Sequence, residues 1–371
     1  SGGTAFNMNL PAGVAGAIVS VADYAATFQT TNLTVVPNGT DKIGSQNENA
    51  TLNIQGQSVT FVFVDSTQGW INTMDSTSNV RGNANLVATG GTITTSGNCK
   101  IHTFTGPGDF TVTNTAACAA NNVVSYMVVA GGASGGKGNA GGGGAGGFRE
   151  VKSPVTPYTA SPLDGYSTPA NRVTVSTQAY PITVGGGGTA QPTPYNPGNV
   201  GSNSIFSTII SAGGGVGGSY SNDGGAGGSG GGAGADNNSG GAGNTPPTTP
   251  AQGQNGANTT GPICGASGGG GAGGAGNSPS PAQQGGAGGA GVTTQINASP
   301  VQRAGGGGGW GRPGPGGAGG AGGGGAGASE PGGAAGCGTA NTGGGGGGKG
   351  NPSPSGGAGG SGIVIIRYKF Q

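Results

Sequence analysis

The chain has few charged residues and a single histidine, and both shortages narrow the functions it can have. Only 6% of its 371 residues are charged, and the net charge is +1. A nucleic-acid-binding face requires clustered lysine or arginine, so no nucleic-acid partner is expected. Because His102 is the only histidine, the glycine–serine–glycine patterns of the chain do not predict a serine hydrolase. We therefore expect no enzyme activity and no cofactor.

Long apolar runs and closely spaced cysteines are also missing. No stretch approaches 18 consecutive apolar residues, so membrane insertion is not expected. The four cysteines include no Cys-x-x-Cys pair, so no zinc or other metal site is predicted. Four cysteines allow three pairings. Cys99 and Cys118 flank a predicted hairpin, 101–105 with 110–113, and are candidates for a local disulfide. Cys264 and Cys337 each lie beside a glycine tract and are candidates for a bridge between tracts.

Glycine is the abundant residue, and its distribution divides the chain. There are 96 glycines and 23 prolines, and only 14 of the glycines precede residue 131. Many later tracts have alanine at every third position, as at Ala287 and Ala290 or Ala318 and Ala321. A period of three is that of the polyproline II helix, which rises about 3.1 Å per residue and has no internal hydrogen bonds. Buried backbone groups need partners, so such tracts are expected to pack as a bundle.

The period of three makes further predictions about the tracts. A ten-residue segment such as Gly268–Asn277 would span about 31 Å if it were one straight helix. The alanines would mark one edge of each helix, the outer edge. Short β-branched strands that run directly into glycine, as at Tyr126–Gly132 and Tyr180–Gly186, would form the base of the bundle.

These patterns predict a mainly β chain with two folded parts. Residues 1–80 are expected to form a small β domain with a strong strand at 58–64 and Trp70 in its core. Residues 81–98 are small and polar and are predicted to be a linker. Residues 99–371 are predicted to form a β-strand platform that carries a bundle of polyglycine, polyproline II helices.

Candidate binding residues lie where tracts are connected, because loops held by a rigid scaffold often carry function. Tyr195, Tyr220 and Trp310, with Arg312 nearby, are aromatic or basic side chains in glycine-rich surroundings. They are interpreted either as local packing or as contacts to a sugar or protein at the far tip. The segments rich in proline, serine and asparagine add further candidates for contact with a receptor, namely Asn196, Pro247, Thr248, Asn277, Ser278, Ser280, Asn351 and Ser353.

The succession of these segments resembles a known family. Residues 123–132, 141–150, 179–188, 201–209 and 360–368 are similar to the glycine-rich tail-fibre and adhesin proteins of marine tailed phages, especially those that infect cyanobacteria. Residues 33–44 and 64–70 resemble a small β module of the same fibre proteins. The resemblance implies a virion appendage, located outside the cell, whose tip recognises a host surface. The tip loops differ between family members, so no binding residue carries over.

The first functional hypothesis is therefore a receptor-binding tail-fibre protein, without catalysis, that recognises a host polysaccharide or an outer-membrane protein. Other fibre proteins of the virion are expected partners, and a homo-oligomer, either a trimer or a filament, is expected. An alternative is a self-assembling extracellular or capsid fibre without a receptor. An ice-binding protein is a third hypothesis, which the irregular tracts disfavour.

Overall fold

The chain forms two compact units in a computed structural model. The structure describes residues 5–76, 85–260, 265–279, 283–351 and 355–371. One unit comprises Ser1–Gly82 and the other Asn83–Gln371. The chain is mainly β, as predicted. No helix in these described ranges has the length and apolar character needed to cross a membrane.

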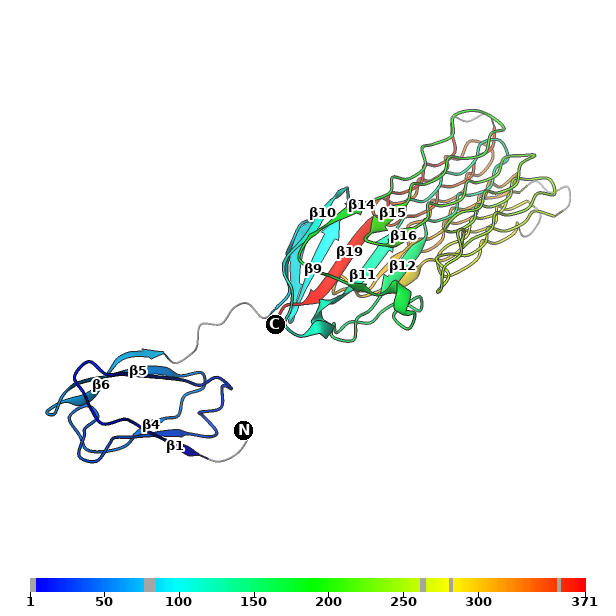
Figure 1. The fold of residues 1–371 in the computed structure, drawn as a ribbon. Coiled ribbons are helices and arrows are strands. Elements are labelled where there is room, and N and C mark those ends of the chain that lie inside the picture. The colour runs from blue at the N-terminus through cyan, green and yellow to red at the C-terminus, as the bar shows by residue number, and fades with distance from the viewer. Residues whose placement is uncertain (1–4, 77–84, 261–264, 280–282, 352–354) are drawn as a thin grey trace. The chain divides into compact units, whose positions relative to one another are not determined.

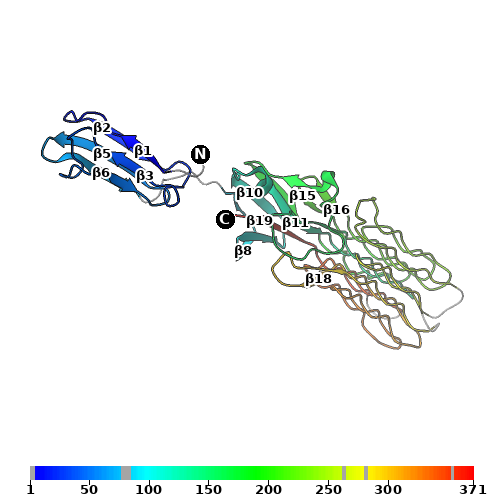
Figure 2. The same cartoon turned by 90° about the horizontal axis from the view of Figure 1, so that it is seen from below.

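The N-terminal unit contains two three-stranded sheets (Figure 2). One sheet has the order β1-β3-β4 and consists of β1 (Phe6–Asn9), β3 (Leu33–Val36) and β4 (Ala50–Leu52). The other has the order β2-β5-β6 and consists of β2 (Ile18–Ala22), β5 (Ser58–Asp65) and β6 (Gly69–Ser76). The alternating side chains of β5 place Val59, Phe61 and Phe63 inside, as the period of a strand requires. Trp70 is fully buried in the same core, which confirms the prediction from the sequence.

The second unit begins with two larger sheets (Figure 1). The five-stranded sheet has the order β16-β15-β14-β10-β7 and consists of β16 (Ile209–Ser211), β15 (Ser204–Phe206), β14 (Ala179–Thr183), β10 (Gly108–Asn114) and β7 (Val87–Thr89). The other sheet has the order β12-β11-β19-β9-β8 and consists of β12 (Phe148–Val151), β11 (Val123–Val129), β19 (Ile363–Lys369), β9 (Cys99–Phe104) and β8 (Thr92–Ser96). The short β13 (Val173–Thr174) pairs with the start of β11. Two short 3₁₀ helices, η1 (Ala119–Asn122) and η2 (Pro169–Asn171), lie in connections.

The two sheets share one core, and β11 and β19 are covered on both faces. Phe110 and Phe206 of one sheet pack in a cluster with Tyr126 and Tyr368 of the other. On the opposite face, Met127 and other side chains of the β11 sheet contact the hairpin of β17 (Val292–Thr294) and β18 (Val301–Arg303). Strands buried on both faces read as continuous apolar runs, which explains why β11 and β19 contain so few polar residues.

Two local predictions are wrong. The segments 101–105 and 110–113 do not form a hairpin, because β9 pairs with β8 and β19 whereas β10 pairs with β14 and β7. The turn between them carries the chain from one sheet to the other, and turn residues alone do not distinguish these outcomes. The predicted linker also differs, since β7 and β8 lie within 81–98. Threonine is polar but favours strands, so the composition of this segment suits short strands as well as a linker.

The glycine tracts extend from the strand ends as extended segments side by side (Figure 1). Successive amides of the tract 141–147 donate to three neighbouring tracts in rotation, at N···O distances of 2.8–3.0 Å. Residues 141, 144 and 147 donate to one neighbour, at Gly218, Gly215 and Ala212. Residues 142 and 145 donate to a second, at Ser267 and Gly270. Residues 143 and 146 donate to a third, at Gly346 and Gly343. The tract 305–310 repeats this rotation toward three other segments. A β-strand has only two bonding directions, so the repeat of three is a distinct arrangement.

Because glycine has no side chain, neighbouring tracts lie close enough to form these backbone hydrogen bonds. A Cβ atom on Gly307 would overlap the carbonyl oxygen of Gly346, and one on Gly143 would overlap that of Ala133. By contrast, a Cβ on Gly186 would meet nothing within 4 Å. Glycine is therefore required wherever a tract faces its neighbours and is replaceable where it faces outward.

Alanine marks the outer edge of only some tracts, because Ala133, Ala145 and Ala233 are fully buried, and the length prediction fails. Exposed or half-buried alanines occupy the outer positions of the tracts, namely Ala275, Ala287, Ala290, Ala318 and Ala321. Ala272, however, is fully buried in the cluster under the β11 sheet. The chain turns back beside it, since the amide of Gly271 donates to Gly274 and that of Gly268 donates to Asn277. The segment Gly268–Asn277 is therefore two antiparallel pieces and does not span 31 Å.

Candidate functional site

The turn at Gly138 and Ala140 is the centre of the loop cluster at the end of the tracts remote from the sheets. The tract that leaves β11 reaches this turn and returns toward β12. The carbonyl oxygen of Gly138 accepts a hydrogen bond from Tyr220, and its amide donates to Lys349, both at 2.9 Å. The carbonyl oxygen of Ala140 accepts one from Trp310 at 3.1 Å. Loops that are distant in the sequence thus meet at one place, which we call the tip.

Two exposed tyrosines belong to this tip. Tyr195 is 57% exposed and Tyr220 is 42% exposed. The hydroxyl of Ser219 donates to the carbonyl oxygen of Tyr195 at 2.9 Å, which fixes the two loops together. The amide of Lys137 donates to the carbonyl oxygen of Asn196 at 3.1 Å. Exposed aromatic rings on fixed loops suit contacts to sugars or to protein surfaces.

Trp310 and Arg312 lie at the same tip but differ in exposure. Trp310 is only 1% exposed and packs with Ala266 and Ala328. Its burial favours the interpretation of Trp310 as a packing residue over that of an exposed contact at the tip. The Arg312 side chain is 57% exposed, and its Nε lies 3.6 Å from the Glu330 carboxylate. An exposed ion pair of this kind contributes little stability and leaves the guanidinium accessible.

The remaining predicted contact residues separate into three groups. Asn277 and Ser278 are exposed, and the Ser278 hydroxyl donates to the carbonyl oxygen of Asn258 at 2.7 Å. Asn351 is half-buried beside Lys349. Ser280 and Ser353 lie outside the described residues, as does Cys264 of the predicted tract disulfide.

Pro247 and Thr248 do not belong to the tip. The side-chain oxygen of Asn244 accepts hydrogen bonds from the amide and the hydroxyl of Thr248, at 2.9 and 3.0 Å. The side-chain amide of Asn171, next to η2, donates to the carbonyl oxygen of Thr249 at 2.8 Å. The loop therefore packs beside the sheets, because Asn171 ties it there, and its proline-rich composition did not reveal which end it occupies.

The cysteines do not form the predicted local bridge. Cys99, Cys118 and Cys337 are all free. Cys99 is buried at the start of β9, whereas Cys118 is exposed just before η1. The bridge required the hairpin that the structure does not form.

A buried polar cluster beneath the sheet was not predicted. Glu150 of β12 is 2% exposed, and its carboxylate accepts hydrogen bonds from the Thr294 hydroxyl and, at 2.9 Å, from the Ser161 amide. Burial raises the pKa of Glu150, and these hydrogen bonds oppose the increase. Burial also lowers the pKa of Arg303, which the charge of Glu150 opposes. Because the cluster joins β12 to the β17–β18 hairpin, it serves the fold.

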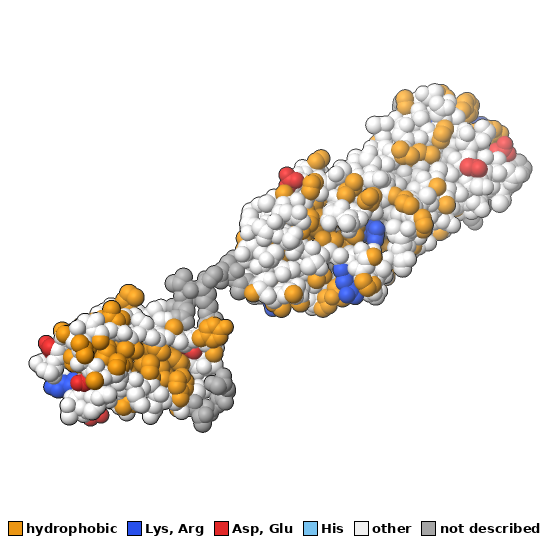
Figure 3. All heavy atoms as spheres, viewed as in Figure 1, with side chains coloured by type: hydrophobic (Ala, Val, Ile, Leu, Met, Phe, Trp, Pro, Cys, Tyr) orange, Lys and Arg blue, Asp and Glu red, His pale blue; other side chains and the backbone are white. Residues whose placement is uncertain are grey.

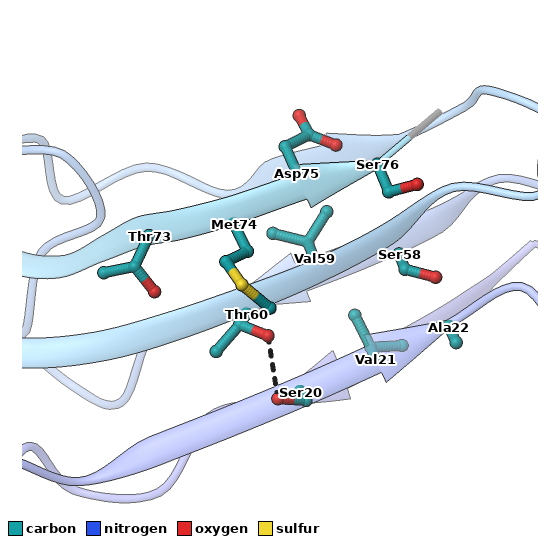
Figure 4. A pocket seen from close by; sticks show the side chains of 10 residues that line it. All are labelled: Ser20, Val21, Ala22, Ser58, Val59, Thr60, Thr73, Met74, Asp75 and Ser76. Carbon is teal, nitrogen blue, oxygen red and sulfur yellow. Dashed lines mark hydrogen bonds between the residues drawn. The ribbon is translucent and has the colours of Figure 1, made fainter. Parts of the chain in front are cut away.

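A groove lies on the N-terminal unit, over β2, β5 and β6, with a volume of about 610 Å³ (Figure 4). Met74 reaches across toward Thr60, whose hydroxyl lies 3.0 Å from that of Ser20 (Figure 4). Asp75 is the only ionisable side chain lining it, so it lacks a partner for acid–base chemistry. Nor do the described ranges contain three or more histidine, cysteine or acidic side chains grouped to hold a metal.

The surface around these sites is poor in charge, and hydrophobic atoms are scattered over the second unit (Figure 3). A family model described as a glycine-rich domain matches residues 103–369. The match covers the glycine tracts and most strands of both sheets, and it leaves out the N-terminal unit, β7, β8 and the start of β9. No curated protein matches the chain.

Proposed function

Because the chain belongs to the glycine-rich domain family, we propose that its glycine tracts are polyproline II helices that form a rigid support for the loops of the tip. The threefold rotation of the amide hydrogen bonds carries this proposal, since polyproline II has three residues per turn. Most tract glycines also avoid positive φ. The exceptions lie at turns and are Gly138, Gly322, Gly323, Gly332 and Gly343.

The function that this arrangement supports best is recognition of a host surface by a tail-fibre adhesin. Glycine loses much conformational entropy on folding, so dense backbone hydrogen bonding must offset this cost in a large glycine module. Tyr195 and Tyr220 lie on loops that hydrogen bonds hold to one another and to these tracts. Loops that are fixed before binding lose less entropy when they meet a partner.

The proposed partner is a polysaccharide or an outer-membrane protein on the host cell, and the proposed location is a virion appendage. The resemblance of the strand and glycine segments to marine phage fibres supports this assignment, and the exposed tip tyrosines agree with it. A homo-oligomer within a longer fibre would present several tips together, which raises avidity without new contacts.

The test is binding of purified, fluorescently labelled protein to intact candidate host cells, with unrelated cells as the control. We expect saturable binding to one group of hosts that unlabelled protein competes away. Equal binding to all cells or to none, together with filaments in electron micrographs, would contradict the adhesin and support the structural fibre instead. Edge strands such as β6, which pairs only with β5 among the described strands, offer a route to such filaments.

A further inference from the structure

Lys349 is an almost fully buried cation at the tip. It follows Gly348 and precedes Gly350 in an otherwise uncharged tract, and it is 3% exposed. Its amide donates to the carbonyl oxygen of Gly136 at 3.2 Å, and its own carbonyl oxygen accepts a hydrogen bond from Gly138 at 2.9 Å. The backbone on both sides of the side chain is therefore held by the tracts.

The ammonium group of Lys349 lacks an anionic partner. Within the described ranges it makes no hydrogen bond, and the ion pair found there joins Arg312 to Glu330 instead. Burial lowers the pKa of Lys349, and the nearby charge of Glu330 opposes that decrease. Partial removal of an ammonium group from water without an acceptor is costly. Because Lys349 lines two open pockets, an acceptor on a ligand could reach it and would be stabilised.

Asn351 carries a second unsatisfied group beside it. Its side-chain Oδ1 is buried and has no hydrogen-bond partner. An amide oxygen accepts hydrogen bonds but does not donate them. The two groups together therefore suit a ligand that has both an anionic oxygen for Lys349 and a hydroxyl group for Asn351.

Two adjoining pockets open onto Lys349. The smaller has a volume of about 60 Å³ and is lined by Trp310, Glu330, Lys349 and Asn351 among others. The larger has a volume of about 210 Å³, and Lys349 and Gly332 line both pockets. Drug-sized ligands occupy pockets of about 300–1,000 Å³, so this space suits a single small ring. Glycine-lined walls at Gly332 and Gly356 allow a ligand to approach the backbone closely.

We propose that Lys349 and Asn351 form a binding subsite for an acidic sugar. The carboxylate accepts hydrogen bonds from the Lys349 ammonium, a hydroxyl of the sugar donates to Asn351 Oδ1, and the ring lies in the larger pocket. A free phosphate dianion lacks a ring to fill the larger pocket, and a neutral sugar lacks the charge. The inference rests on the proposed function, because it names the part of a host polysaccharide that the tip would bind.

Trp310 provides a direct readout because it lines the smaller pocket. The chain has only two tryptophans, so Trp70→Phe in the N-terminal unit leaves Trp310 as the sole reporter. Sodium glucuronate, glucose and sodium phosphate are titrated separately into this protein. We expect a saturable fluorescence change with glucuronate and at least about tenfold weaker binding of the other two. Glucose lacks the charge-assisted hydrogen bond, and phosphate lacks the ring that would fill the larger pocket. Equal responses to glucose or phosphate would overturn the proposal.

Three variants test whether glucuronate binds at Lys349 and Asn351. Lys349→Met removes the charge, shortens the unbranched side chain by one atom and should weaken glucuronate binding at least about tenfold. Asn351→Asp leaves the buried lysine in place, should repel the carboxylate and serves if Lys349→Met does not fold. Lys100→Met on β9 removes one positive charge from the sheets and should leave binding unchanged. Unaltered glucuronate affinity in Asn351→Asp and in a folded Lys349→Met would overturn the subsite.

The cell-binding test separates this inference from the proposed function. Saturable binding to host cells with no response to glucuronate would overturn the acidic-sugar subsite alone. Glucuronate binding that depends on Lys349, without binding to any cell, would support the subsite and overturn the adhesin.

Discussion

The amide of Gly307 donates to the carbonyl oxygen of Gly143 at 2.9 Å, and the amide of Gly143 donates in turn to Gly346 at 2.8 Å. Each tract therefore bonds to different neighbours through successive residues. Such a network has no side chains to hold it in place, and its stability depends on uninterrupted backbone contact.

Gly307→Ala should destabilise the second unit strongly. The added Cβ would overlap the carbonyl oxygen of Gly346, and overpacking of a closed interior costs about 1–3 kcal/mol or more. The measurement is the midpoint of thermal or denaturant unfolding. Gly186→Ala is the matched control, because its Cβ would meet nothing within 4 Å, and it should be neutral or stabilising by about 0.4–1 kcal/mol. Equal effects of the two variants would contradict the packed-tract account.

Amide hydrogen exchange should show the same contrast without substitution. The amides of residues 141–147 all donate hydrogen bonds and should exchange only when the unit opens extensively. The described part of the chain contains no acceptor for the amide of exposed Gly186, which should exchange rapidly. Fast exchange throughout 141–147 in folded protein would mean that the tracts are not hydrogen-bonded in solution.

Glu150→Gln should remove a pH dependence of stability. Burial raises the pKa of folded Glu150 above its ordinary value of 4.5, so the folded chain holds this proton more tightly than the unfolded chain. Its stabilising contribution is present below pH 4.5 and is lost as pH rises through the folded pKa. Urea unfolding at several pH values should therefore show a flatter profile in the variant. The control is Asp109→Asn at an exposed position, and parallel profiles for Glu150→Gln and wild type would refute the prediction.

Cysteine labelling tests the free thiols. Cys118 and Cys337 are exposed and Cys99 is buried, so iodoacetamide should modify the first two in folded protein and Cys99 only after unfolding. Peptide mass spectrometry without reductant provides the measurement. A peptide that joins Cys99 to Cys118 would contradict the structure, and one that joins Cys337 to Cys264 would support the distant bridge predicted from the sequence.

The sequence predicted elements whose pattern is local. The apolar run of β11, the burial of Trp70 and the outward position of some alanines, such as Ala287 and Ala290, follow from side-chain alternation and the period of three. The sequence did not predict the partners of β9 and β10, because a turn at Gly106 suits either a hairpin or a crossing between sheets. The buried turn at Ala272 was missed for a similar reason, since glycine and alanine continue through it without interruption.

The candidate site was predicted only in part. Tyr195 and Tyr220 were identified as aromatics in glycine-rich surroundings, whereas Thr248 was placed at the wrong end because its anchor, Asn171, is distant in the sequence. Lys349 was not predicted as a site residue. In the sequence, this residue is marked only as a lone charge within an uncharged tract. The fold is needed to show that the residue has little exposed surface.

The most direct test of the account compares the two ends of the glycine module in binding to host cells. Tyr195→Ala combined with Tyr220→Ala removes the exposed tip aromatics, and Thr248→Ala removes a side chain from the loop beside the sheets. We predict that the double tip variant loses at least about tenfold in apparent affinity, as hot-spot aromatics do, while Thr248→Ala binds like wild type. Wild-type binding by the folded double variant, or a loss confined to Thr248→Ala, would contradict a receptor-binding tip.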